Sequence, residues 1–173
     1  MIKWIILAIF IISALFVHRR GKVKHSFYRQ FFDHSTFFAP VNFLMYLFSK
    51  VPNQPYIDTQ HFADLKVLDE NWEMIRDEAQ ALYQQGGIKA SSSYDDLGFN
   101  SFFKTGWKRF YLKWYDSAHP SAAELCPKTT ALLKTLPSIK AAMFTELSPY
   151  TRLFRHRDPY ASSLRYHLGK KEI

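Results

Sequence analysis

The residues best suited to chemistry lie near the C-terminus, at His156-Arg157-Asp158. In an extended strand, residues two apart point to the same face, so an imidazole and a carboxylate would stand side by side. These groups supply two of the three ligands of the two-His-one-carboxylate triad, which binds non-haem Fe(II) and leaves positions open for O2 and substrate. The pattern is short and also fits a salt-bridged surface pair, because Arg152 and Arg155 lie nearby.

A second candidate group is Arg165-Tyr166-His167, which begins nine residues after His156. A guanidinium that projects into a metal cavity can bind a carboxylate through two parallel hydrogen bonds, which suits a dicarboxylate cosubstrate. Arg165 taken alone equally fits a structural ion pair. The residues by themselves leave both interpretations open.

The elements that must position these residues predict an α+β fold with strands accumulating toward the C-terminus. Aromatic and polar residues alternate over Trp107–Tyr115, which predicts a strand with Phe110, Leu112 and Trp114 on one face. Further short strands are expected at Ile139–Leu147, Arg152–His156 and Ser163–Leu168, with a short helix at Pro127–Leu136. A longer helix is predicted by apolar residues at spacings of three and four: Leu65, Leu68, Trp72, Ile75, Ala79 and Leu82.

The N-terminal run Met1–Val17 is predominantly apolar, with Lys3 as its only charged side chain, and is just long enough to span a membrane. A cleaved signal peptide would carry its positive charges before the apolar run, whereas here the basic cluster follows it. We therefore expect a retained anchor over residues 1–18. The positive charges after it predict that the bulk of the chain faces the cytoplasm.

A second apolar stretch, Phe37–Val51, contains Pro40 and Asn42 and is short for a membrane span. Its length and composition favour an interfacial helix that lies on the bilayer. An ordinary buried helix and a second membrane pass are the alternatives.

Composition narrows the classes of protein. With 47% hydrophobic residues and 22% charged residues the chain is globular, and its one cysteine, Cys126, cannot form an intrachain disulfide. The formal net charge is +8, and residues 1–60 hold 7 Lys and Arg against 2 Asp and Glu. Because this excess lies beside the most apolar part of the chain, it favours an anionic membrane surface over nucleic acid as the partner.

Several long segments resemble the aspartyl/asparaginyl β-hydroxylase family, and within it the bacterial lipid A 2-hydroxylases. The resemblance extends from the apolar helix to Gly169 and rests on HRRGKVKH, DHSTFFAPVNFLMYLFSKVPNQPY, ENWEMIRDEA, DDLGFNSFFKTGWKRFYLKWYD, AELCPKTTALL, SIKAAMF and RHRDPYASSLRYHLG. It implies an Fe(II)/2-oxoglutarate dioxygenase that uses O2 and has a double-stranded β-helix (jelly-roll-like) core. It also implies a bacterial inner-membrane protein that adds a 2-hydroxyl to a secondary acyl chain of lipid A, or acts on another membrane lipid.

The same resemblance assigns roles to individual residues. It implies His156 and Asp158 as iron ligands, with Arg165 and His167 in the 2-oxoglutarate site. Thr145 and Trp107 match family positions that line the same pocket.

The resemblance ends at Gly169, before the family's second iron-binding His and second basic residue for the cosubstrate. We therefore expect residues 58–173 to form an incomplete dioxygenase domain, following a basic juxtamembrane and interfacial region over 19–57, and we expect little or no activity of the 173-residue chain. The alternatives are a non-catalytic remnant and a membrane-anchored basic protein that binds anionic lipid without chemistry.

Overall fold

The computed structural model describes residues 1–21, 23–52, 54, 56–84, 89–90, 107–115, 117–152, 156 and 158–169. The chain divides into two compact units. The helical unit consists of residues 1–61 and 154–169, and the sheet unit consists of residues 62–153 and 170–173.

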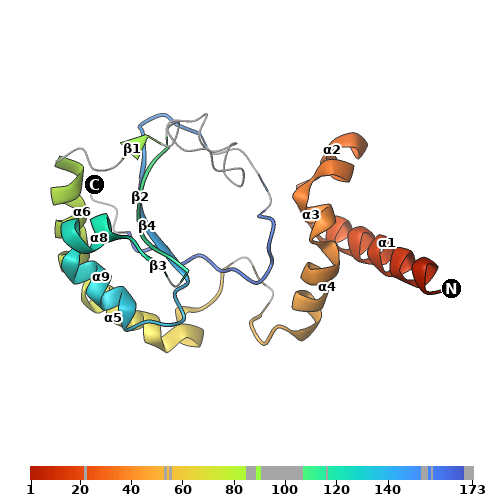
Figure 1. Cartoon of the computed structure of the whole chain (residues 1–173), viewed down its shortest axis with the longest axis horizontal. Coiled ribbons are helices and arrows are strands. Elements are labelled where there is room, and N and C mark those ends of the chain that lie inside the picture. Colours follow the sequence, from red (N-terminus) through yellow and green to blue (C-terminus); the bar gives the residue numbers. More distant parts are fainter. Residues whose placement is uncertain are drawn as a thin grey trace. The chain divides into compact units, whose positions relative to one another are not determined.

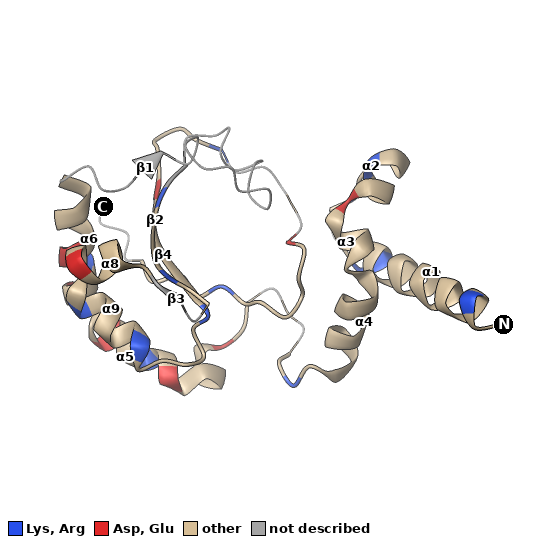
Figure 2. Ribbon diagram, in the orientation of Figure 1, with Lys and Arg blue, Asp and Glu red and all other residues tan. Residues whose placement is uncertain are grey.

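The N-terminal part of the helical unit contains four helices (Figure 1): α1 (Ile2–Arg20), α2 (Phe27–Phe32), α3 (His34–Phe37) and α4 (Ala39–Phe48). The first of them confirms the helix predicted for the N-terminal apolar run, and it is long and apolar enough to cross a membrane. Figure 2 shows this helix with charged residues only near its two ends. α4 forms within the predicted apolar stretch, while α2 and α3 were not predicted.

Aromatic contacts pack α1 against α4. The ring of Phe16 meets Phe43 edge-on with centroids 5.0 Å apart, and the Arg20 guanidinium lies 4.3 Å from the centroid of the Tyr46 ring. The Lys24 ammonium donates hydrogen bonds to two backbone carbonyls in the last turn of α1, at 2.7 and 3.2 Å. A cation at that end of a helix satisfies carbonyls that have no partner within the helix.

Asp33 begins α3 by accepting a hydrogen bond from the backbone N–H of Ser35 at 2.9 Å. Burial of the Asp33 carboxyl raises its pKa. The hydrogen bonds from Ser35 and the charges of His34 and His25 outweigh burial, so the net effect lowers the pKa of Asp33 below its ordinary value.

The sheet unit combines helices and strands. Its described elements are η1 (Thr59–Leu65, which begins in the helical unit), α5 (Lys66–Glu70), α6 (Trp72–Gln84), β1 (Lys89–Ala90), β2 (Trp107–Trp114), β3 (Ser117–Ala118), α8 (Pro120–Leu125), α9 (Pro127–Lys134) and β4 (Ala141–Leu147). β2 pairs antiparallel with β4 over most of its length, and the two-residue strands β1 and β3 also pair with β2. The helices lie on one side of this sheet (Figure 1), where α8 and α9 pack against β2 and α6 packs against α9.

The core of the sheet unit lies between the helices and β2. Its buried apolar side chains are Leu65, Leu68, Ile75, Leu82, Leu112, Ala122, Cys126, Leu133 and Leu136. Four of these belong to the stripe of apolar residues that predicted the longer helix. That helix is interrupted at Asn71, whose side-chain amide donates to the carbonyl of Val67 at 2.8 Å, so the stripe is divided among the end of η1, α5 and α6.

The strand predicted at Trp107–Tyr115 is confirmed as β2, and the one predicted at Ile139–Leu147 is confirmed as the slightly shorter β4. The predicted facing within β2 was wrong, because a bulge occurs between Tyr111 and Lys113. An extra residue reverses the alternation beyond it. Trp114 therefore shares a face with Tyr111, and their ring centroids lie 5.5 Å apart.

The two C-terminal strand predictions have different outcomes. The strand expected at Ser163–Leu168 was wrong, because no strand is described there and none of the described strands pairs with the segment. Most of Arg152–His156 lies outside the described residues. The mixed helix and strand fold is established, whereas the double-stranded β-helix core is not confirmed by the small described sheet.

Candidate functional site

Three of the predicted site residues come together in the helical unit. His156 Nε2 lies 3.8 Å from Asp158 Oδ1, and Arg165 Nη2 donates a hydrogen bond to the same oxygen at 2.8 Å. The three side chains keep between a third and just under half of their surface exposed, so solvent reaches the cluster. A single carboxylate oxygen is thus shared by an imidazole and a guanidinium.

The cluster is compatible with both interpretations of the sequence, a structural ion pair and a metal site. The short Arg165–Asp158 contact is a charge-assisted hydrogen bond of the kind expected for a structural ion pair. The carboxylate oxygen that Arg165 bonds is also the one 3.8 Å from the imidazole nitrogen, and Asp158 Oδ2 is a further acceptor. The cluster therefore presents a nitrogen and an oxygen donor that can face one cation.

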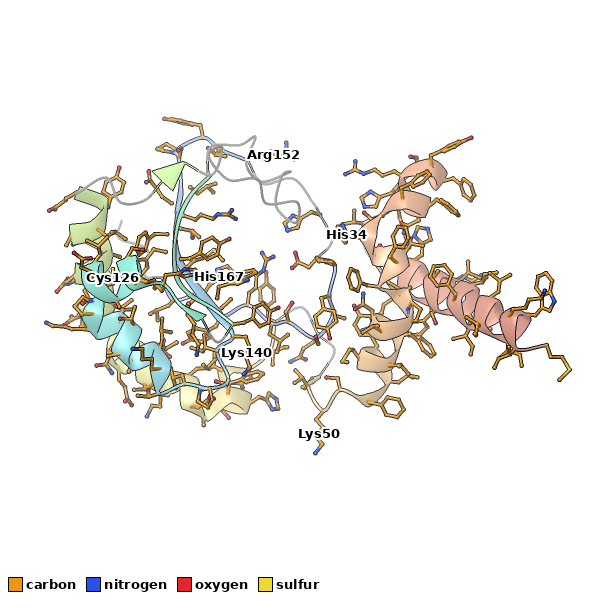
Figure 3. The ribbon with its side chains drawn as sticks, viewed as in Figure 1. His34, Lys50, Cys126, Lys140, Arg152 and His167 are labelled. Carbon is orange, nitrogen blue, oxygen red and sulfur yellow. The ribbon has the colours of Figure 1, made fainter. Side chains whose placement is uncertain are left out.

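His167 lies two residues after Arg165 and is exposed; Figure 3 labels it. Within the part of the chain that the structure describes, no three His, Cys, Asp or Glu side chains gather where a metal ion could bind. The described donor set is therefore the His156–Asp158 pair.

The segment after Asp158 is fastened to α4 by a residue that the sequence did not single out for the site. The Asn42 side chain donates from Nδ2 to the carbonyl of Pro159 at 3.0 Å, and its Oδ1 accepts from the backbone N–H of Ala161 at 2.9 Å. The ring of Tyr160, between them, meets Phe38 at a centroid distance of 6.4 Å. A lone Asn within an apolar run was the available signal, but nothing local could identify its partners.

The other two predicted residues belong to the sheet unit. The ladder pairs Arg109 with Thr145 and Trp107 with Leu147, so positions 107 and 145 lie on one face of the β2–β4 ladder. Arg109, directly opposite Thr145, is only 6% exposed, and its guanidinium lies 4.9 Å from the centroid of the Tyr111 ring. The sequence did not indicate this buried cation.

Cys126 is a poor candidate for chemistry. It is completely buried between α8 and α9 (Figure 3). Burial, with a smaller contribution from the negative charge of Glu78, raises the pKa of the Cys126 thiol to about 11. The thiol is therefore protonated at neutral pH, which makes it a weak nucleophile and a weak metal ligand.

Comparison with known proteins decides the family. The Aspartyl/Asparaginyl beta-hydroxylase family matches residues 69–171, which is more than half of the chain. The chain belongs to this family. The matched range includes β2, β4 and the segment that carries His156, Asp158, Arg165 and His167.

Two hydroxylases illustrate the relationship. The chain is 28% identical over 123 residues to the Ornithine lipid ester-linked acyl 2-hydroxylase of Rhizobium tropici, covering 70% of this chain and 44% of that protein. It is 29% identical over 110 residues to the human Aspartyl/asparaginyl beta-hydroxylase, covering 61% of this chain and 14% of that protein. The chain thus spans less than half the length of these relatives, and no solved structure matches it significantly.

Proposed function

We propose that this hydroxylase-family protein is an Fe(II)/2-oxoglutarate-dependent dioxygenase that hydroxylates an acyl chain of a membrane lipid at the 2-position. Family membership and the similarity to a lipid acyl 2-hydroxylase support this reaction class. The observation that carries the proposal is the approach of His156 Nε2 to Asp158 Oδ1 in a chain of this family. Lipid A, suggested by the sequence segments, is the substrate we propose.

The His156–Asp158 pair fits two positions of an iron site. Two ligand atoms bound at right angles, each about 2.1 Å from a metal, lie about 3 Å apart, so the observed 3.8 Å needs only a small side-chain movement. Asp158 would bind the metal through Oδ1, the oxygen 3.8 Å from His156 Nε2, and this oxygen could keep its hydrogen bond from Arg165 because a carboxylate oxygen has two lone pairs. When bound, iron with 2-oxoglutarate and O2 would supply the oxidation that converts a C–H bond into C–OH.

The remaining predicted residues would bind and orient the reactants. Arg165 presents several N–H donors, so its bond to Asp158 leaves donors for a carboxylate of 2-oxoglutarate. We assign His167 to the same cosubstrate, and Thr145 and Trp107 to the walls of its pocket. These roles predict that Arg165→Ala weakens 2-oxoglutarate binding and that added 2-oxoglutarate partly restores turnover; unchanged cosubstrate affinity would remove Arg165 from the site.

The apolar helices α1 and α4 would place a lipid hydroxylase at the membrane that contains its substrate. α1 would anchor the protein, and the basic residues that follow it would face the cytoplasmic side of a bacterial inner membrane. The exposed apolar residues of α4 suit a helix at the bilayer interface, where acyl chains begin. A C-terminal reporter tests the orientation, because periplasmic activity of the fusion would contradict it.

Mass spectrometry of membrane lipids tests the reaction. Cells that lack 2-hydroxylated lipids and produce, under 18O2, a version of this protein extended by the family's remaining strands should acquire one labelled oxygen on an acyl chain of lipid A. His156→Ala should abolish the product at normal protein levels, while His61→Ala, which alters an exposed histidine in η1, should have no effect. Label in ornithine lipid alone would support the reaction but replace the substrate, and label that persists in His156→Ala would contradict the assigned ligand.

A membrane-anchored protein that binds anionic lipid without chemistry is the second candidate. The Arg165–Asp158 ion pair and the basic excess beside the apolar helices favour it. Binding of anionic vesicles together with no 2-oxoglutarate binding would decide for this candidate. Cosubstrate binding that depends on Arg165 would decide for the enzyme.

A further inference from the structure

Asn42 is a buried amide in an otherwise apolar helix. α4 has the sequence APVNFLMYLF, and the Asn42 side chain is only 3% exposed. Burial of an amide costs free energy unless its donors and acceptor find partners. Here both functional atoms find them, and the partners lie 117 and 119 residues away in the sequence.

The partners of Asn42 form the turn that directly follows Asp158. The amide bonds the carbonyl of Pro159 and the N–H of Ala161, so the side chain spans the turn from both ends. Phe38 precedes Asn42 by four residues and therefore lies on the same side of α4, where its ring contacts Tyr160. The turn is thus held by α4 at three consecutive residues.

Arg165 holds the Asp158 side chain itself, through a hydrogen bond of 2.8 Å to its carboxylate. Asp158 therefore lies between a side-chain ion pair and a backbone segment fixed to α4. α4 is itself packed against α1 through Phe16 and Phe43. A continuous set of contacts connects the candidate membrane helix to the residue next to Asp158.

We propose that Asn42 is a positioning residue for metal binding, fastening the turn after Asp158 to the α1–α4 helix pair so that Asp158 and His156 face one cation. This inference rests on the proposed function. Groups that hold metal ligands in place typically change metal affinity by about 10- to 100-fold when removed. The same contacts would fix the metal pair relative to the helices that meet the lipid.

Mn(II) affinity of the purified full chain under anaerobic conditions tests the proposal. Asn42→Ala removes both hydrogen bonds and should weaken Mn(II) binding by about 10-fold or more. Asn42→Asp keeps an acceptor for the Ala161 N–H but loses the donor to Pro159, so its affinity should be intermediate. Asn71→Ala is the matched control, because it removes an Asn side-chain hydrogen bond in the sheet unit and should leave Mn(II) affinity unchanged.

Two further measurements separate positioning from stability. Hydrogen exchange of the Ala161 amide should accelerate in Asn42→Ala, while helix content by circular dichroism stays near that of the unaltered protein. Unchanged Mn(II) affinity with faster Ala161 exchange would overturn the proposal and leave Asn42 a purely structural role. If Asn42→Ala fails to fold, an unchanged affinity in Asn42→Asp would overturn it equally.

His156→Ala distinguishes failure of this inference from failure of the proposed function. If His156→Ala weakens Mn(II) binding and neither Asn42 variant does, the metal site stands and the role of Asn42 is wrong. If His156→Ala leaves Mn(II) affinity unchanged, the metal site itself is wrong and the proposal for Asn42 is overturned with it.

Discussion

The helical unit and the sheet unit treat their apolar residues in opposite ways. The sheet unit buries residues such as Leu82, Leu112 and Leu133 among its own helices and strands. The helical unit leaves large apolar side chains exposed along α1, α2 and α4: Ile5, Ile6, Ile9, Ile12, Leu15, Phe27, Tyr28, Phe31, Phe32, Leu44, Leu47 and Phe48. Exposed apolar surface of this extent is typical of proteins that bind a membrane or another protein, so the comparison indicates that the helical unit uses these side chains to bind such a partner.

The predicted site residues are also divided between the two units. The His156–Asp158–Arg165 cluster belongs to the unit with the exposed apolar helices, whereas Thr145 and Trp107 belong to the unit with the closed core. If the proposed metal role holds, this placement in the unit with exposed apolar helices suits a substrate whose reacting carbon is part of a lipid. The residues assigned to the cosubstrate are divided between the units, because Arg165 and His167 belong to the helical unit.

The largest expected effect comes from placing charges in α1. Ile9→Asp with Ile12→Asp should cost about 6 kcal/mol of membrane insertion, because each Asp near the centre of a spanning helix costs about 3 kcal/mol. The variant should lose carbonate-resistant membrane association. Tyr83→Asp with Leu125→Asp adds the same charges to exposed positions of the sheet unit and should leave association unchanged. If the α1 variant stays in the membrane after carbonate extraction, the proposal that α1 anchors the protein is wrong.

The next effect compares one leucine from each unit. Leu82 lies on α6 and is 1% exposed. Leu82→Ala should lower the free energy of unfolding of the sheet unit by about 2–5 kcal/mol, because the substitution leaves a cavity. Leu44→Ala removes the same atoms from an exposed position of α4 and should change stability little. The lone thiol of Cys126, buried in the same core, reports unfolding through urea-dependent alkylation. Equal alkylation midpoints for the two variants would contradict the contrast between the units.

A smaller effect is expected where α6 supports the start of α9. The Glu78 carboxylate accepts hydrogen bonds from the backbone N–H groups of Lys128 and Thr129, at 2.9 and 2.8 Å. Glu78→Ala leaves these donors without that partner and should cost about 1–2 kcal/mol, again measured by Cys126 alkylation in urea. Glu73→Ala, at an exposed position of the same helix, is the control and should cost little.

The last effect, which is absent at neutral pH, concerns the pH dependence of the sheet unit. Because the pKa of Cys126 rises from its ordinary value of 9.0 to about 11 in the folded chain, the unfolded chain releases this proton first as the pH increases. The contribution of Cys126 to stability is therefore unaffected below about pH 9 and is lost between about pH 9 and 11. The urea concentration at the midpoint of unfolding, followed by circular dichroism, should fall between pH 9 and 11 in the unaltered protein. It should fall less in Cys126→Ser. An identical pH profile in the two proteins would contradict the raised pKa.

Local patterns in the sequence predicted the elements whose determinants are local. The apolar run predicted α1, the aromatic alternation predicted β2, and the spacing of apolar residues predicted the buried face of α5 and α6. The bulge in β2 could not be predicted this way, because it depends on pairing with β4, some thirty residues later. The break at Asn71 likewise depends on a side-chain bond to Val67 that competes with the helix.

The candidate site shows the same limit more clearly. The His-x-Asp spacing and the family resemblance identified His156, Asp158 and Arg165, and the structure brings these three together. Asn42 was noted only as a polar residue in an apolar run. Its contacts to Pro159 and Ala161 join segments more than a hundred residues apart, and only the fold reveals such contacts.

The central claim is that His156 binds the metal of a lipid hydroxylase. Pulsed electron paramagnetic resonance of Mn(II), bound in place of Fe(II), detects the nitrogen of an imidazole ligand directly. If His156 binds the metal, imidazole nitrogen coupling should appear in the unaltered protein and in His61→Ala, and the coupling assigned to His156 should be lost in His156→Ala. The same nitrogen coupling in His156→Ala as in the unaltered protein would contradict the account.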